Sequence, residues 1–263
     1  MKITLVAGAR PNFMKIAPII RAIENSNRAG NPLIEYRLVH TGQHYDEKLS
    51  EIFFKELEIP EPHINLGIGS GTQSEQTARI MMAFEKDLLA NPCDVVVVVG
   101  DVNSTMACAI VAKKLNTRVA HVEGGIRSFD MTMPEEINRM VTDSITDYFF
   151  TTSEVANNNL KKSGIDERSI FFVGNTMIDS LASNLSKAKK PGLWEANRLE
   201  PEKYFVLTLH RPSNVDDPEI FKVLIKAVAQ SASESKVVFP VHPRTQRNAK
   251  TIRGTDNLIV SDP

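Results

Sequence analysis

Five consecutive valines, Val95–Val99, constrain the fold of this chain more than any other feature of its sequence. The run is apolar at every position rather than at alternate positions, which is typical of a strand that is buried on both faces. Strands of this kind occur in parallel sheets that are covered by helices on both sides. The run therefore predicts an α/β protein built around a parallel sheet.

Short apolar runs alternate with longer helical patterns along the rest of the chain. The expected strands are Ile3–Ala7, Tyr36–His40, Val95–Val99, Arg118–Val122, Tyr148–Thr151, Ile170–Val173, Phe205–Leu209, Lys236–Pro240 and Leu258–Val260. The expected helices include Lys15–Glu24, Gln76–Leu89, Thr105–Leu115, Glu135–Ser144 and Glu154–Lys162. Repeated strand–helix–strand units predict a doubly wound α/β fold.

A polar stretch with prolines near both ends, Lys187–Pro201, interrupts this alternation. We place an N-terminal domain at residues 1–188 and the start of a second domain at residues 189–263. About three strands follow the boundary, which are few for a sheet that must stand alone. We therefore expect the second domain to be incomplete in this sequence.

Charge and composition argue against several classes of partner. The formal net charge is −1 and basic and acidic residues are spread along the chain, so no footprint for nucleic acid or an anionic membrane is present. No apolar run approaches the roughly 18 residues that a membrane-spanning helix needs. Arg10 interrupts the apolar N-terminus, which argues against a signal peptide. We expect a cytoplasmic protein that binds neither nucleic acid nor membrane.

Charged residues follow the expected strands at the places where open α/β sheets bind ligands. Arg10 and Lys15 lie in Gly8–Lys15, where a helix N-terminus already favours an anion. Asp101 follows the valine strand and either faces the cleft or caps the next helix. Glu123 stands between a strand and two glycines, which permit close approach of a ligand.

The helix expected after Pro134 opens with two glutamates, Glu135 and Glu136. Acidic residues in a first helical turn are ordinary partners of the helix dipole. We expect one of the two to be structural and the other to approach the loop of Glu123.

Two histidines, His210 and His242, each end a strand, and the arginines Arg211 and Arg244 follow them. This repeated arrangement suggests a clamp for a diphosphate. The spacing of histidines, cysteines and carboxylates matches no metal site, and no serine-hydrolase motif is present. We expect no metal and no cofactor.

Several motifs occur together in a fixed order, namely GARPNFMKIAPI, TGQHYD, VVVGDVNSTMA, HVEGGIRS with PEEINR, GNTMID, LTLHRPSN and PVHPRT. With them the sequence resembles the non-hydrolysing UDP-N-acetylglucosamine 2-epimerases over essentially its whole length. The resemblance implies a glycosyltransferase-B-like fold of two Rossmann-like domains that hold a UDP-sugar between them. It also implies a homodimer that makes a precursor of surface polysaccharides.

The same resemblance implies a reaction and assigns residues to it. UDP is eliminated anti from UDP-GlcNAc to give 2-acetamidoglucal, and it adds back with the C2 proton on the other face to give UDP-ManNAc. Carried over by motif, the catalytic residues are Asp101, Glu123, Glu135 and His210, with His210 at the diphosphate. The substrate-binding candidates are Arg10, Lys15, Glu136, Arg139, His242 and Arg244.

The sequence departs from the family pattern in two respects. It stops before an Asp-Ser-Gly-Gly motif that grips uridine and phosphate, so we expect most of the UDP site to be missing and the fragment to be inactive as given. Members that bind a second, activating UDP-GlcNAc carry glutamines and an arginine near TGQH. Here Asp46 stands where we expect a glutamine, and Gly67–Gly71 contains no arginine.

Four alternatives remain open at this point. A sister epimerase acts on UDP-2,3-diacetamido-glucuronic acid by the same mechanism. A hydrolysing epimerase releases free N-acetylmannosamine, although Arg10-Pro11 departs from the usual opening of that type. A glycosyltransferase on the same fold needs an acceptor site, and a non-catalytic module only binds nucleotide-sugars.

Overall fold

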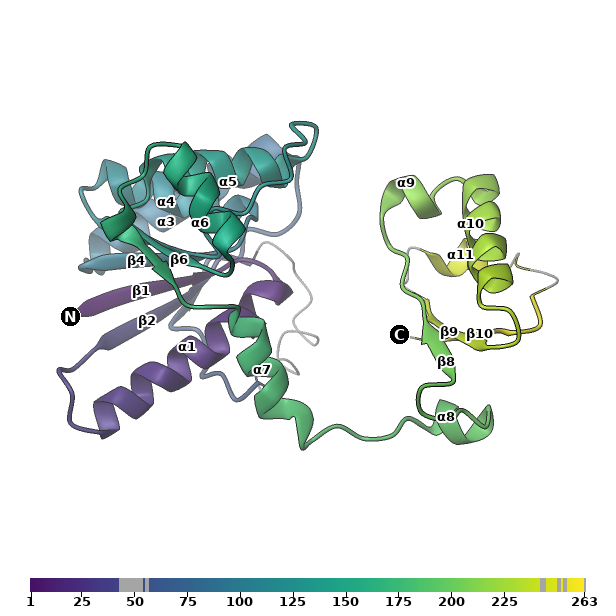
Figure 1. Ribbon diagram of the computed structural model, residues 1–263. Helices are drawn as coiled ribbons and strands as arrows, with labels where there is room; N and C mark the ends of the chain where they lie inside the picture. Colours follow the sequence, from purple (N-terminus) through teal and green to yellow (C-terminus); the bar gives the residue numbers. More distant parts are fainter. Residues whose placement is uncertain (43–53, 55–56, 242–244, 250–251, 253–254, 263) are drawn as a thin grey trace. The chain divides into compact units, whose positions relative to one another are not determined.

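The computed structural model describes residues 1–42, 54, 57–241, 245–249, 252 and 255–262. The chain forms two compact units, residues 1–186 and residues 187–263, which are drawn in Figure 1. Each unit is described here by itself. The assignment of the second unit as the start of a further Rossmann-like domain stays a prediction.

Unit 1 is built on a sheet of seven strands in the order β3-β2-β1-β4-β5-β6-β7. Every neighbouring pair in it is parallel, as the valine run predicts. The strands are β1 Lys2–Ala7, β2 Glu35–His40, β3 Ile64–Asn65, β4 Val95–Val99, β5 Arg118–Val122, β6 Tyr148–Thr151 and β7 Ile170–Phe172. All five valines of β4 are buried.

Helices cover both faces of this sheet (Figure 1). The helices of unit 1 are α1 Arg10–Arg28, α3 Gln73–Ala90, α4 Asn103–Lys114, α5 Pro134–Ile145, α6 Glu154–Lys162 and α7 Thr176–Leu185, with a 3₁₀ turn η1 Glu167–Ser169. Val95, Val97 and Val99 belong to the core beneath α1. Val96 and Val98 belong to the core with α3 and α4. A strand between two such cores has no polar face, which explains the uninterrupted valines.

The strand order places a switch point between β1 and β4. From β1 the chain winds outward to β2 and β3, and from β4 it winds the other way to β7. In open parallel sheets a ligand binds outside the carboxyl ends of the strands at such a point. The loops after β1, β4 and β5 therefore form the part of unit 1 in which a site is expected.

Helix α1 contains a proline in its interior, and helix α7 compensates for it. Pro11 lies in the first turn, where its missing N–H is not needed. Pro18 lies inside the helix, so the Met14 carbonyl, four residues earlier, has no amide donor there. The Ser180 hydroxyl of α7 donates a hydrogen bond to that carbonyl. The two helices are therefore joined where the proline interrupts the helix.

Unit 2 has a three-stranded parallel sheet in the order β10-β9-β8. Its elements are α8 Gly192–Ala196, β8 Tyr204–Val206, α9 Pro212–Val215, α10 Pro218–Ser231, β9 Lys236–Pro240, α11 Gln246–Ala249 and β10 Leu258–Ser261. Phe221, Ile225 and Phe239 form the centre of its core. The expected strand Phe205–Leu209 is shorter in the structure and begins one residue earlier.

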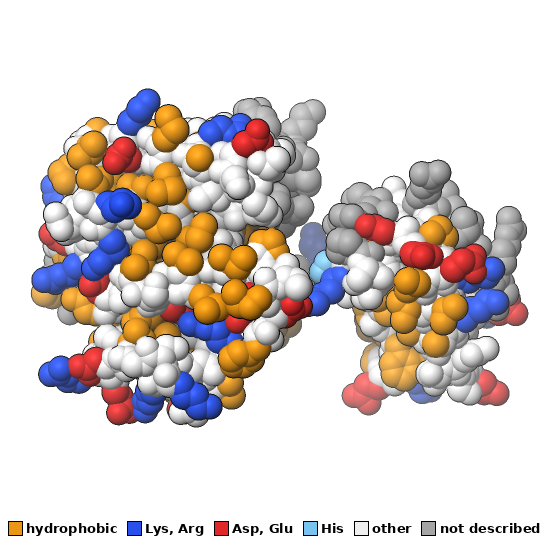
Figure 2. Space-filling model, turned by 90° about the horizontal axis from the view of Figure 1, so that it is seen from above, with side chains coloured by type: hydrophobic (Ala, Val, Ile, Leu, Met, Phe, Trp, Pro, Cys, Tyr) orange, Lys and Arg blue, Asp and Glu red, His pale blue; other side chains and the backbone are white. Residues whose placement is uncertain are grey.

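Within the described part of the chain, no helix combines the length and the apolar character that crossing a membrane requires. On the face seen in Figure 2, basic and acidic side chains are interspersed with hydrophobic ones. This mixture is consistent with the net charge of −1.

Candidate active site

The turn after β1 is tied to the end of β4 by Asn12. Its Oδ1 accepts hydrogen bonds from the amides of Gly8 and Ala9 at 3.0 and 2.9 Å, and its Nδ2 donates to the Val99 carbonyl at 3.0 Å. Asn12 is buried. Sequence analysis missed this residue, although an asparagine beside a Gly-Ala turn is a recognised turn signal. The hydrogen bonds of Asn12 therefore join the turn after β1 to the end of β4, the two strands at the switch point.

Lys15 and Glu123 form an ion pair across this switch point. The Lys15 ammonium donates to Glu123 Oε2, and both side chains are largely buried. The two residues lie 108 positions apart in the sequence. The structure therefore brings together two of the predicted site residues, one from the first helix and one from the loop after β5.

The backbone around this pair adopts uncommon conformations. Glu123 has φ of 73°, in the left-handed region that a residue with a side chain seldom occupies. Its amide donates to the Phe150 carbonyl at 2.9 Å, which helps to hold it there. A Cβ atom on Gly100 would lie 3.1 Å from Lys15 Nζ and 3.4 Å from Glu123 Oε2. Strained backbone of this kind is concentrated at functional sites.

Asp101 follows Gly100 and is held by an arginine. Its Oδ2 accepts hydrogen bonds from Nη2 and Nε of Arg139 at 2.6 and 3.1 Å. The N-cap of α4 is Val102, so Asp101 is not a helix cap. Its side chain keeps 31% of its surface exposed, so that a ligand can reach it. Asp101 therefore follows the glycine that lies close to Glu123, and each carboxylate is paired with a cation.

The two glutamates at the start of α5 differ sharply, and the expected approach of one of them to the Glu123 loop stays a prediction. Glu136 is buried and accepts hydrogen bonds from Ser128, Phe129 and Arg139. Burial alone would raise the pKa of Glu136, but these hydrogen bonds lower it from 4.5 to about 2. Glu136 thus anchors the loop before α5 as a carboxylate. Glu135 is exposed on the first turn of the same helix.

Buried amides fix the remaining side of the Asp101 loop. Asn138 Nδ2 donates to the Asp101 carbonyl at 2.8 Å and to Asn103 Oδ1 at 3.2 Å. Asn103 in turn donates to Gln73 and Gln76 of α3 at 2.7 and 2.9 Å. Sequence analysis missed these residues, because single amides in helices carry no spacing signal.

A buried histidine beneath the loops was also missed. His121, in the middle of β5, contacts the Gly100 carbonyl and the Asp143 carboxylate. Asp143 also accepts from the Gly125 amide and from Arg127. A histidine inside an otherwise apolar strand was the available signal, because a polar group buried there needs partners.

The other predicted site residues belong to unit 2 or have side chains outside the described residues. His210 is exposed in unit 2 between β8 and α9. Arg10 begins α1, but its side chain is outside the described part. His242 and Arg244, and Asp46 of the TGQHYD motif, also lie outside the described residues. Contact of these residues with a substrate stays a prediction.

The segment Gly67–Gly71 contains no arginine of its own, but an arginine from helix α3 contacts it. Arg79 of α3 donates from Nη2 to the Ser70 carbonyl at 2.9 Å. The helix begins at Gln73, with Thr72 as its cap, and runs so that its second turn lies against the segment. Sequence proximity alone could not show this contact.

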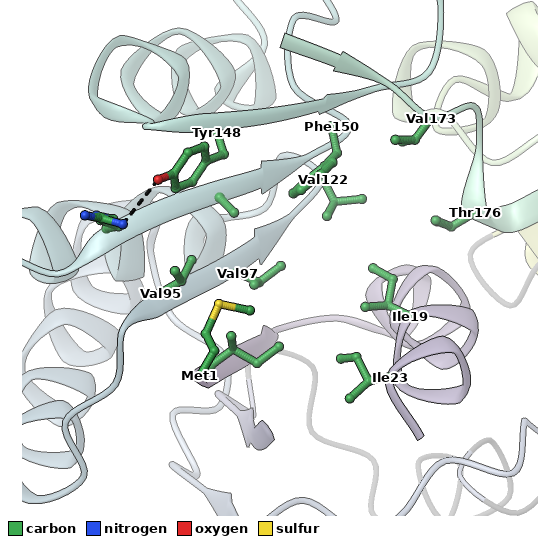
Figure 3. A pocket seen from close by; sticks show the side chains of 13 residues that line it. Met1, Ile19, Ile23, Val95, Val97, Val122, Tyr148, Phe150, Val173 and Thr176 are labelled. Atoms are coloured by element: carbon green, nitrogen blue, oxygen red, sulfur yellow. Dashed lines mark hydrogen bonds between the residues drawn. The ribbon is translucent and has the colours of Figure 1, made fainter. Parts of the chain in front are cut away.

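Unit 1 also contains an apolar cavity of about 480 Å³ against the sheet face beneath α1. Figure 3 shows Ile19 and Ile23 of α1 facing Val95, Val97 and Val122 across it. The dashed line marks the 3.4 Å hydrogen bond between Arg118 and the Tyr148 hydroxyl at one end. With so few polar groups, this cavity does not suit a nucleotide-sugar. Among the residues that the structure describes, no cluster of histidines, cysteines and carboxylates could hold a metal ion.

Comparison with known proteins decides the family. A family model described as UDP-N-acetylglucosamine 2-epimerase matches residues 27–263. The UDP-N-acetylglucosamine 2-epimerase of Methanocaldococcus jannaschii is 44% identical over 98% of this chain and 70% of its own length. This chain belongs to the UDP-N-acetylglucosamine 2-epimerase family. The family predicted from the motifs is thereby confirmed, as is the enzyme class, because the relatives are isomerases.

Solved structures agree with this assignment. The crystal structure of the Methanocaldococcus jannaschii epimerase in complex with UDP-GlcNAc and UDP aligns with 100% of this chain, and the alignment covers 74% of the epimerase chain. The sequence identity is 42% and the TM-score is 0.84. A lipopolysaccharide galactosyltransferase, 14% identical with a TM-score of 0.50, shares the fold alone. The predicted α/β, glycosyltransferase-B-like fold class is confirmed.

The family includes enzymes with different substrates. The UDP-2,3-diacetamido-2,3-dideoxy-D-glucuronate 2-epimerase of Pseudomonas aeruginosa is 40% identical over 94% of this chain and 68% of its own length. Family membership by itself therefore leaves the sugar open.

Proposed function

We propose that this chain carries the acid–base part of an enzyme that interconverts UDP-GlcNAc and UDP-ManNAc. The supporting observation is that Gly100, at the end of β4, directly precedes Asp101 and lies close to the Lys15–Glu123 ion pair. Each carboxylate is paired with a cation, Asp101 with Arg139 and Glu123 with Lys15. Two carboxylates beside one ligand position suit removal of a proton and its return.

The proposed reaction has two steps, an elimination of UDP and its addition with the opposite stereochemical outcome at C2. A carboxylate removes the C2 proton, the anomeric C–O bond breaks, and UDP departs with the electron pair of that bond to leave 2-acetamidoglucal. UDP then attacks C1 again while a second acid places a proton on the opposite face of C2. The electron pair of the C2–H bond forms the C1–C2 double bond in the first step and the new C2–H bond in the second, so no oxidant is needed.

We assign roles to residues within this proposal. Asp101, Glu123 and Glu135 are the carboxylates around the sugar, and which of them removes the proton is left open. His210 contacts the diphosphate or assists its departure, and Arg10 and Lys15 hold the nucleotide-sugar. Further contacts to substrate are proposed for Glu136, Arg139, His242 and Arg244.

Arg139 and Glu136 have a second role besides any contact with substrate. Arg139 is shared between Asp101 and Glu136, so it fixes the direction of the Asp101 carboxylate. Removal of a proton from carbon depends strongly on such alignment. In this proposal, Arg139 and Glu136 contact the substrate and also position Asp101.

A second candidate substrate has a specific observation in its favour. The Pseudomonas aeruginosa relative at 40% identity carries a name that specifies UDP-2,3-diacetamido-2,3-dideoxy-D-glucuronate. The same two-step reaction at C2 would apply to that sugar, since its carboxyl group lies away from C1 and C2. A module that binds nucleotide-sugars without catalysis is a further alternative.

Product analysis with both sugars tests the proposal. The chain with the C-terminal Asp-Ser-Gly-Gly segment of the family restored is incubated with UDP-GlcNAc and, separately, with UDP-2,3-diacetamido-glucuronic acid, and products are identified by NMR. UDP-ManNAc from the first incubation supports the proposal. Free N-acetylmannosamine would indicate the hydrolysing reaction. Turnover of the second sugar alone would select the alternative, and tight binding of UDP without turnover of either would indicate a module that only binds.

We further propose a cytoplasmic homodimer that supplies a precursor for surface polysaccharide. This rests on the resemblance to the family. Sedimentation of the purified chain tests the dimer, which a single species of 29.3 kDa would contradict.

A further inference from the structure

His121 is fully buried beneath the loops that carry Asp101 and Glu123. Its Nε2 lies 2.8 Å from the Gly100 carbonyl oxygen, and its Nδ1 lies 2.7 Å from Asp143 Oδ1. None of the residues assigned above to catalysis or substrate binding is His121 or Asp143. The pair therefore needs an account of its own, because buried polar groups are costly unless they serve packing or function.

Both partners of the His121 ring are hydrogen-bond acceptors. A backbone carbonyl has no proton to donate, and a carboxylate accepts at both oxygens. Asp143 Oδ2 already accepts from the Gly125 amide at 3.0 Å and from Arg127 Nη1 at 2.6 Å. Each ring nitrogen of His121 must therefore donate, which requires a proton on both.

The state of Asp143 agrees with this arrangement. Burial alone would raise the pKa of Asp143, but the hydrogen bond and charge of His121, together with Arg127, lower it below its usual value. A charged carboxylate between an imidazolium and a guanidinium is the paired arrangement that a buried ion requires.

We propose that His121 is a positioning residue: a doubly protonated ring that joins the Gly100 carbonyl to the Asp143 carboxylate and so fixes the two turns that carry Asp101 and Glu123. This deepens the proposed function and rests on it for its catalytic consequence. Gly100 precedes Asp101, and the Gly125 amide bound by Asp143 lies two residues after Glu123.

The bridge has little room to shift. A Cβ atom on Gly124 would lie 3.5 Å from His121 Nδ1 and 3.4 Å from Asp143 Oδ1, so the Glu123 turn passes directly over the pair. Loss of the bridge would release the Gly100 carbonyl and the Asp101 loop behind it. A displacement of about 1 Å in such a loop can reduce a rate roughly 10²-fold.

Two substitutions of His121 separate positioning from packing. In His121→Gln the amide nitrogen can still donate to Gly100, whereas His121→Leu has no donor. We expect kcat to fall roughly 10²-fold in His121→Leu while KM changes little, and His121→Gln to restore most of the loss.

Asp87→Asn is the matched control. Asp87 is as buried as Asp143 and also pairs with an arginine, Arg37, but Arg37 lies near the start of β2. We expect Asp87→Asn to lower Tm and leave kcat unchanged. Equal kcat losses in His121→Leu and Asp87→Asn, or equal losses in the leucine and glutamine variants, would overturn the positioning role.

The ring itself is read directly by NMR. In the full chain with ¹⁵N-labelled histidine at pH 7, the signals of His121 are those absent from His121→Gln. Two ring N–H signals are expected, and one would overturn the proposal. If the chain catalyses no exchange at C2, the proposed function fails separately. The backbone amide signals of Gly100 and Gly125 then still test whether the ring fixes the turns. We expect both signals to shift in His121→Leu and to keep their positions in His121→Gln.

Discussion

Arg139 binds Asp101 and Glu136 at once. Two of its nitrogens lie 2.6 and 3.1 Å from Asp101 Oδ2, and the third lies 2.9 Å from Glu136 Oε2. Glu136 in turn holds the loop of Ser128 and Phe129. The guanidinium therefore connects a partly exposed carboxylate with a buried one. This connection makes the alignment of Asp101 depend on residues that need not touch a substrate.

Replacement of Arg139 by lysine tests this dependence. A lysine ammonium is a single point charge and cannot span two carboxylates as the planar guanidinium does. We expect Arg139→Lys to lower kcat roughly 10²-fold with the fold retained. Arg118→Lys is the control, because Arg118 lies at the start of β5, where its side chain donates to the Tyr148 hydroxyl at 3.4 Å. Equal rates for the two variants would contradict the role given to Arg139.

Glu136 makes stability depend on pH in a defined direction. Its pKa in the folded chain is lowered from 4.5 to about 2, so its contribution is present above pH 4.5 and is lost as pH falls toward 2. We expect Glu136→Gln to reduce the free energy of unfolding by about 1–3 kcal/mol at neutral pH. The difference from wild type should shrink at pH 3 in urea unfolding. The exposed Glu135→Gln should show little effect at either pH, and a pH-independent cost of Glu136→Gln would refute the assignment.

The contact between Ser180 and the Met14 carbonyl predicts a coupling with Pro18. Ser180→Ala should reduce the free energy of unfolding by about 1 kcal/mol. In a Pro18→Ala background the amide of residue 18 can take the Met14 carbonyl, so the same change should cost less. Urea unfolding of the four proteins gives the coupling energy. Strictly additive effects would show that the proline is irrelevant to the docking of α7.

Two glycines with nearly the same φ separate backbone strain from lack of space. Gly125 has φ of 82° and Gly164 has φ of 84°. A Cβ atom on Gly125 would lie 2.5 Å from the Ala156 carbonyl oxygen, whereas one on Gly164 meets nothing within 4 Å. Gly164→Ala should therefore cost only the left-handed strain, roughly 1–2 kcal/mol. Gly125→Ala should lower Tm much further, and similar Tm values for both would rule out the close contact.

The sequence predicted the sheet well because burial on both faces leaves a clear pattern. The strands at Val95–Val99, Arg118–Val122 and Tyr148–Thr151 have the predicted bounds. The short edge strand β3 was missed, since two residues cannot show a periodicity. The shortened strand β8 shows that an apolar run can extend beyond the paired segment.

The sequence points to the charged groups of the candidate site, whose roles stay a prediction, and not to the residues that support them. Asp101, Lys15 and Glu123 follow strands, so the rule for ligand sites in open sheets finds them. The partner of each charge depends on how side chains meet across loops far apart in sequence, as with Lys15 and Glu123. His121 could have been found, because a histidine inside a buried strand requires hydrogen-bond partners.

Hydrogen exchange at C2 with the Asp101→Asn protein tests whether Asp101 takes part in moving the C2 proton. The chain and the variant, each with the C-terminal Asp-Ser-Gly-Gly segment of the family restored, are incubated with UDP-GlcNAc in deuterium oxide, and C2 is followed by proton NMR beside circular dichroism of both proteins. The account predicts deuterium at C2 and UDP-ManNAc with the wild-type chain, and neither with a folded Asp101→Asn protein. Near-normal exchange in the folded variant would contradict the role of Asp101, and absence of exchange in the wild-type chain would contradict the proposed function.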